Sequence, residues 1–143
     1  MTVIYDHEAL HYLYEKLDDT VRKQLDEFLG DYYKNSSEEF KRDIDYYGYA
    51  AKSKDWFSEI HSRVATQEKL IPDSLDQHYS KYFDSRKSIV DKYLKIKAIV
   101  ETAALQCQLT KRYTDCSKAA SYVDDLATTT TPLRDKIRSA YGF

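Results

Sequence analysis

Apolar positions recur at helical spacing near the start of the chain. From Leu10 to Tyr32 they follow one another at intervals of four, three, four, four, three and four residues. This spacing is close to the 3.6-residue period of an α-helix, so the apolar side chains share one face. Asp6 precedes the run as an N-cap candidate. The pattern predicts one amphipathic helix over residues 6–34.

A second helix is predicted over residues 36–70. It begins at a capping box, in which Ser36 is followed three positions later by a glutamate. Its apolar stripe changes sides between residues 48 and 55. We expect a continuous helix that bends there. Two alternatives stay open, a fresh helix start capped by Ser53 or Asp55 and a straight helix sandwiched between neighbours at its two ends.

The third predicted helix, over residues 73–112, is the longest. No Gly or Pro occurs from residue 73 through 131, and a heptad seam runs from Leu75 to Thr110 with Arg86 as its only charged member. A second apolar line widens this face, as expected for the central helix of a bundle. The excess apolar width predicts a symmetric homodimer through residues 75–110, with Arg86 at the edge of the contact or opposite an acid.

The rest of the chain predicts shorter elements. A helical pattern near residues 119–126 is either a separate helix or the tail of the long one, and Pro132 after a threonine predicts a last short helix over residues 132–140. We therefore expect a single all-α domain spanning residues 1–143. Its predicted architecture is an elongated antiparallel bundle of three long helices, closed by one or two short C-terminal helices.

Composition narrows the fold class and the compartment. Three Gly and two Pro are too few for the turns of an all-β or a doubly wound α/β fold. No apolar stretch approaches the roughly 20 residues that span a bilayer, and the first residues lack a signal-peptide pattern. We expect a cytoplasmic protein without a membrane partner.

The two cysteines support the same expectation. Cys107 and Cys116 are nine residues apart, and on one continuous helix they would face opposite sides about 13 Å apart, too far for a disulfide. The sequence therefore predicts two free thiols in a reducing compartment.

Charge does not indicate a nucleic-acid partner. The 22 Lys and Arg residues are balanced by 24 Asp and Glu residues, a net charge of -2. The most basic stretch includes Lys87, Lys92, Lys95 and Lys97 but is interrupted by aspartates, which is typical of a solvated helix face.

No complete catalytic motif is visible. The three glycines are isolated, so there is no phosphate-binding loop, and neither cysteine has a histidine near it in sequence. Glu8 and His11 form one half of the E-x-x-H pattern of carboxylate-bridged di-iron bundles, and His7 lies one turn before His11. Because the other half is missing, we expect no metal ligand, no cofactor and no enzyme activity. A metal-dependent bundle enzyme using Glu8, His7 and His11 with acids from another helix is the alternative.

Tyrosine is the unusual component, at 14 of 143 positions. Neighbouring tyrosines on a helix point in different directions, so they cannot all enter one core. Tyrosine and tryptophan are enriched in protein interfaces, although a slender bundle also uses tyrosine as a half-buried filler. We expect a non-enzymatic protein-interaction module, such as an adaptor, inhibitor or immunity-type protein. Its predicted partner-binding residues are Tyr32, Tyr33, Tyr46, Tyr49 and Trp56.

Overall fold

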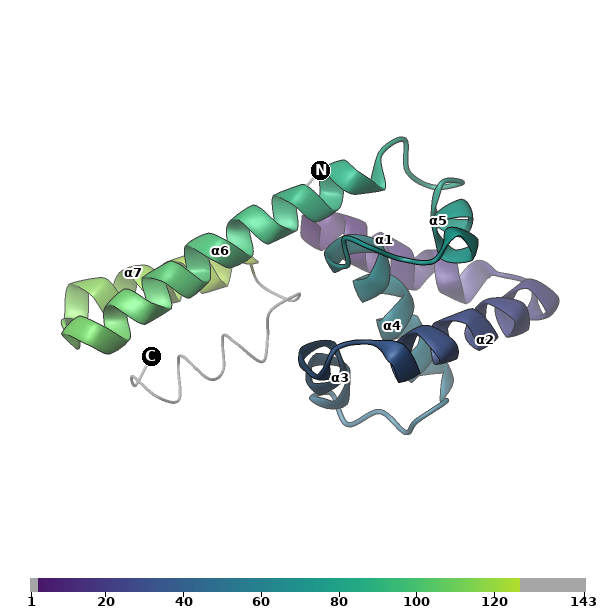
Figure 1. The fold of residues 1–143 in the computed structure, drawn as a ribbon, viewed down its shortest axis with the longest axis horizontal. Helices are drawn as coiled ribbons and strands as arrows, with labels where there is room; N and C mark the ends of the chain where they lie inside the picture. The colour runs from purple at the N-terminus through teal and green to yellow at the C-terminus, as the bar shows by residue number, and fades with distance from the viewer. Residues whose placement is uncertain (1–2, 127–143) are drawn as a thin grey trace. The chain divides into compact units, whose positions relative to one another are not determined.

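The protein is all-α, as predicted. The computed structural model describes the backbone of residues 3–126 and the side chains of residues 6–122, and within this part of the chain it contains helices but no strand (Figure 1). The helices are α1 (Val3–Lys16), α2 (Asp19–Asn35), α3 (Glu38–Asp45), α4 (Lys54–Gln67), α5 (Asp73–Tyr79), α6 (Arg86–Thr110) and α7 (Tyr113–Leu126). The described residues form two compact units, unit 1 up to Val90 and unit 2 from Asp91, so the first residues of α6 belong to unit 1.

The predicted first helix is in fact two helices. Asp18 separates α1 from α2, and its carboxylate accepts hydrogen bonds from the backbone N–H groups of Thr20 and Val21 at 3.0 Å each. An aspartate that caps a new helix in this way competes with continuation of the preceding one. The apolar period continues across the break because Leu10 on α1 and Leu25 on α2 enter the same core.

The predicted second helix is also interrupted, so the expected continuous bend is wrong and the alternative of a fresh start is right. Ser53 caps α4 by accepting a hydrogen bond from the backbone N–H of Trp56 at 3.2 Å. The connection from α3 passes through left-handed backbone at Gly48 and Lys52, with φ of 67° and 64°. The cap of α3 is Ser37, one residue beyond the predicted Ser36.

The prediction of one long third helix is wrong for the same reason, because this helix is also interrupted. It divides into α5 and α6, so the heptad seam is not one continuous helix. Arg86 begins α6 rather than lying within a seam. Its guanidinium pairs with Asp76 at 3.2 Å and donates a hydrogen bond to the backbone carbonyl of Glu68. It thus lies opposite an acid, as expected, but the acid belongs to α5.

The central helix of unit 1 is α4. It contacts α1, α2 and α3, and nearly every side chain from Trp56 to Gln67 is buried. One part of its circumference is apolar, with Ile60 and Val64 in the main core. The rest is polar but equally buried, so its polar groups must find partners within the protein.

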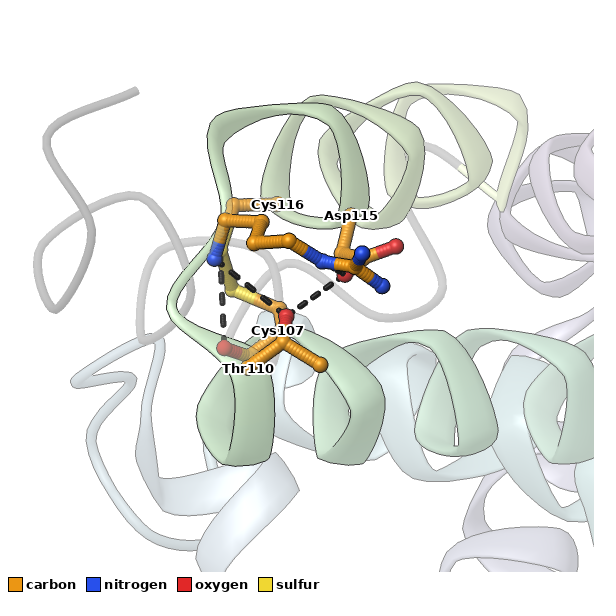
Figure 2. The surroundings of a disulfide bond; sticks show 5 residues. Cys107, Thr110, Asp115 and Cys116 are labelled. Carbon is orange, nitrogen blue, oxygen red and sulfur yellow. Dashed lines mark hydrogen bonds and ion pairs between the residues drawn. A yellow bond between two sulfur atoms is a disulfide. The ribbon is translucent and has the colours of Figure 1, made fainter.

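Unit 2 contains the hairpin of α6 and α7. Helix α6 ends at Thr110, Lys111 takes a left-handed conformation with φ 53°, and α7 returns alongside as a separate helix (Figure 1). The turn brings the Cα atoms of Cys107 and Cys116 to 4.6 Å, and a disulfide joins them (Figure 2). The prediction of free thiols far apart is wrong because the two cysteines lie on different helices.

Polar contacts close the same turn. Asp115 accepts a hydrogen bond from the Thr110 hydroxyl at 2.5 Å (Figure 2). It accepts a second one from Nε of Arg112 at 3.0 Å. The predicted helix over residues 132–140 lies outside the described residues. Between residues 3 and 126, no helix is long and apolar enough to cross a membrane.

Candidate functional site

An aromatic cluster lies where α2 meets the start of α4. The ring of Tyr33 on α2 packs edge-on against Trp56, with centroids 4.7 Å apart, and Trp56 packs against Phe57 at 5.0 Å. The Ser53 cap sets the position of these two α4 rings, because both lie in the first turn after it. Trp56 is only 5% exposed, so most of this ring belongs to the core.

The aromatic cluster forms part of a surface groove of about 890 Å³, here called the α2–α4 groove. Gly30 on α2 lines this groove without a side chain. A Cβ at this position would lie 3.7 Å from the Phe57 ring. The groove carries acids along the middle of α2 and lysines at the end of α2, on α3 and before α4. These charged residues are Asp26, Glu27, Asp31, Lys34, Lys41 and Lys52.

A second group of tyrosines follows α3. The rings of Tyr47 and Tyr49 stack with centroids 5.8 Å apart, and Tyr46 meets Tyr47 edge-on at 5.6 Å. Tyr46 and Tyr49 are 46% and 40% exposed, whereas the Tyr47 hydroxyl accepts a hydrogen bond from the buried Arg63 at 3.1 Å. The Tyr47 ring therefore connects the stack to α4, while Tyr46 and Tyr49 remain partly exposed to solvent.

The structure places the predicted partner-binding residues at three sites. Tyr33 and Trp56 meet at the α2–α4 groove, and Tyr46 and Tyr49 belong to the tyrosine stack. Tyr32 lines a different cavity of about 520 Å³ and donates a hydrogen bond from its hydroxyl to Glu68 at 2.6 Å. The Tyr33 hydroxyl donates to Asp45 at 2.8 Å. Partial burial, together with that carboxylate, raises the pKa of Tyr33 to about 12.

A polar cluster between α1 and α4 was only partly visible in the sequence. His7 and His11 lie one turn apart on α1, and both face Glu59 on α4. Their Nε2 atoms are 3.2 Å apart, and Oε2 of Glu59 lies 3.3 Å from the His11 nitrogen and 3.9 Å from the His7 nitrogen. Glu8, the carboxylate chosen from the sequence, is exposed. The sequence does contain one signal for Glu59. It lies four residues before Arg63 in a stretch with apolar neighbours, a spacing that allows a buried ion pair on one helix.

Buried charge dominates the electrostatics of this cluster. Burial alone would raise the pKa of Glu59, but the hydrogen bond with His11 and the guanidinium of Arg63 outweigh burial and lower it to about 2. Burial lowers the pKa of His7 to about 3, against the attraction of Glu59. The cluster therefore combines an ionised carboxylate with a neutral imidazole near pH 7.

The remaining two histidines form a second pair nearby on α4 and α5. Nε2 of His61 lies 3.0 Å from Nε2 of His78, and the Tyr79 hydroxyl donates to the backbone carbonyl of His61 at 2.8 Å. Burial lowers the pKa of His61 well below its usual value, and burial and Lys81 lower that of His78 to about 4. All four histidines of the chain thus belong to unit 1.

Comparison with known proteins adds no relative. The chain matches no family model, and neither the curated proteins nor the solved structures give a significant match. Functional assignment therefore depends on the geometry of these side chains.

Proposed function

We propose that the chain is a non-enzymatic protein-interaction module that binds another protein through the α2–α4 groove and the adjoining chain around the tyrosine stack. The observation that carries this proposal is the aromatic cluster of Tyr33, Trp56 and Phe57, which lines an open groove between acidic and basic side chains.

The chemistry of the groove indicates what kind of partner fits. Aromatic side chains supply a large contact area at a small cost in conformational entropy, and binding hot spots are rich in them. The acids of α2 and the lysines around it favour a partner with charges of both signs on either side of an apolar stripe. An amphipathic helix offers that arrangement, since its apolar face can enter a groove while its flanks carry charge.

A change at Gly30 tests the groove without touching its charges. Gly30→Leu places a bulky side chain toward Phe57 and fills the groove, whereas Gly30→Ala adds a single carbon at an ordinary contact distance of 3.7 Å. We expect a binding partner to be retained by the wild type and by Gly30→Ala, and to bind Gly30→Leu at least tenfold more weakly. Equal binding by all of them, measured on folded protein, contradicts the groove as the docking site.

The tyrosine stack needs a separate test. Tyr46→Ala with Tyr49→Ala removes two exposed rings, so the fold should persist while partner binding weakens. Tyr12→Ala is the matched control, because Tyr12 is 64% exposed and belongs to neither the groove nor the stack. Trp56→Ala is a poor probe, since a buried ring of this kind costs about 3–5 kcal/mol of stability when truncated.

The residues predicted for the alternative, a metal-dependent enzyme, need one replacement. Glu59 rather than Glu8 faces His7 and His11, so any metal chemistry would use this trio. The convergence of these three side chains favours metal binding, and we propose no reaction on it.

A further inference from the structure

We propose that His7, His11 and Glu59 form a binding site for a divalent transition-metal ion of the zinc class, with one coordination position left to water. The proposal is independent of the docking function. It depends on the convergence of three ligand atoms from α1 and α4, which lie within 4.8 Å of one another.

The distances between the ligand atoms match what a zinc ion requires. Zinc binds imidazole nitrogen and carboxylate oxygen at about 2.0–2.1 Å, so neighbouring ligand atoms of a tetrahedral site lie about 3.3 Å apart. The observed separations are 3.2 Å between the two imidazole nitrogens and 3.3 Å between His11 and Glu59. The third, from His7 to Glu59, is 3.9 Å and needs to shorten by about half an ångström to match the other two.

Two neutral imidazoles serve these three atoms poorly. A neutral imidazole carries one N–H and one lone pair. If His11 keeps its proton on Nε2, that N–H reaches Oε2 of Glu59 and the lone pair of His7 only as one shared, bent hydrogen bond. If His7 donates to His11 instead, the contact between His11 and Glu59 has no hydrogen. A cation accepts all three lone pairs at once.

Neighbouring side chains already orient two of the ligands. Nδ1 of His11 lies 2.8 Å from the Ser58 hydroxyl, which fits a ring that is protonated on Nδ1 and presents the lone pair of Nε2 to an ion. Nε of Arg63 donates to Oε1 of Glu59 at 2.6 Å, which leaves Oε2 directed at the histidines. Outer hydrogen bonds of this kind are a regular feature of metal sites.

The ligand set selects the class of ion. Two imidazoles and one carboxylate suit zinc, cobalt, nickel or ferrous ions, whereas magnesium and calcium prefer oxygen ligands only. Three protein ligands leave a position for water, and the His11 side chain is 28% exposed, so solvent can reach the site. Arg63 competes for the charge of Glu59, so we expect affinity on the order of micromolar rather than nanomolar.

The direct test is titration of the full chain, purified without a histidine tag, with Zn²⁺ and separately with Co²⁺. We expect one ion per chain, and ligand-field bands of bound Co²⁺ with the intensity of a four- or five-coordinate site. Absence of saturable binding below millimolar concentration overturns the proposal, as does Co²⁺ that keeps the weak spectrum of its hexaaqua ion.

Variants identify the ligands. His11→Gln removes a partly exposed ligand with the least damage to the core, and we expect it to weaken Zn²⁺ binding at least tenfold. Glu8→Gln is the matched control, because it neutralises an exposed glutamate on the same turn of α1 and should leave affinity unchanged. Glu59→Gln should also abolish tight binding. If that variant fails to fold, His11→Gln still decides the matter, and unchanged affinity in this variant refutes the site.

Discussion

Arg63 donates a hydrogen bond from Nε to Oε1 of Glu59 across 2.6 Å, and both side chains are almost fully buried. The two residues lie one helical turn apart on α4, and the guanidinium also contacts Tyr47, Gln67 and Asp43. Such a pair stabilises little relative to an apolar pair of the same shape, yet removal of one partner leaves an uncompensated charge in the core.

The first prediction concerns this ion pair. Arg63→Leu should lower the free energy of unfolding by about 3–5 kcal/mol, because Glu59 would then be buried without its cation. The double variant with Glu59→Met should lose clearly less than the sum of the two single changes. Urea denaturation of the four proteins measures this coupling, and additive losses would show that the two side chains do not stabilise each other.

The second prediction concerns acid stability. His78 faces His61, Lys81 and the rings of Tyr79 and Tyr82, and its pKa falls to about 4 in the folded protein against 6.5 for the free side chain. Between these values the unfolded chain binds the extra proton, so stability rises with pH there and is lost as pH falls from about 6.5 toward 4. The slope is up to about 1.4 kcal/mol per pH unit for one such histidine.

The His78→Gln variant isolates this contribution. Denaturation at a series of pH values should give a flatter profile for the variant than for the wild type over that window. Parallel profiles would mean that His78 is not kept neutral by the fold.

The third prediction contrasts two glycines. Gly30 lies inside α2 with ordinary space for a Cβ, so Gly30→Ala should stabilise the protein by about 0.5–1 kcal/mol. Gly48 has φ of 67°, where an L side chain is strained, so Gly48→Ala should destabilise by about 1 kcal/mol. Thermal melts should show a higher melting temperature than the wild type for Gly30→Ala and a lower one for Gly48→Ala.

The fourth prediction concerns the disulfide. The bond between Cys107 and Cys116 closes a loop of about ten residues, for which the chain-entropy account gives about 2.7 kcal/mol. Protein folded under oxidising conditions should gain two hydrogen atoms in mass on reduction, and its α6–α7 hairpin should then be cleaved faster by protease. The Cys107→Ser and Cys116→Ser double variant should match the reduced protein, and equal protease resistance of the oxidised and reduced forms would contradict a stabilising role.

The fifth prediction concerns self-association, predicted from the sequence through residues 75–110. Leu75 and Tyr79 are buried in the core of unit 1, so we propose the contact through the α6 part of that range. Leu105 and Leu109 on α6 are 54% and 72% exposed, an apolar surface that a second copy can cover. Light scattering at micromolar concentration should give a dimer, and Leu109→Glu should shift it toward monomer. A wild-type monomer of 16.8 kDa under these conditions rules out the dimer.

The helical period was readable from the sequence, but the helix breaks were not. Leu10 and Leu25 keep one period across Asp18 because both enter the core of unit 1, and the period by itself cannot distinguish one helix from two that share a core. The capping residues gave a mixed result, because Asp6 lies inside α1 and Ser37 rather than Ser36 caps α3. Ser53 marks a true helix start, since its side chain bonds to a backbone N–H only three residues away.

The sequence by itself determined the all-α class, because the helical period depends on residues within one or two turns of each other. The tertiary structure alone decided that Glu59 meets His7 and His11, and that the turn after Thr110 pairs Cys107 with Cys116. Glu59 is 48 positions from His11, and their contact depends on how α1 packs along α4, to which every intervening turn contributes. Contacts between residues so far apart in sequence depend on how the whole core packs, and no local sequence pattern predicts that packing.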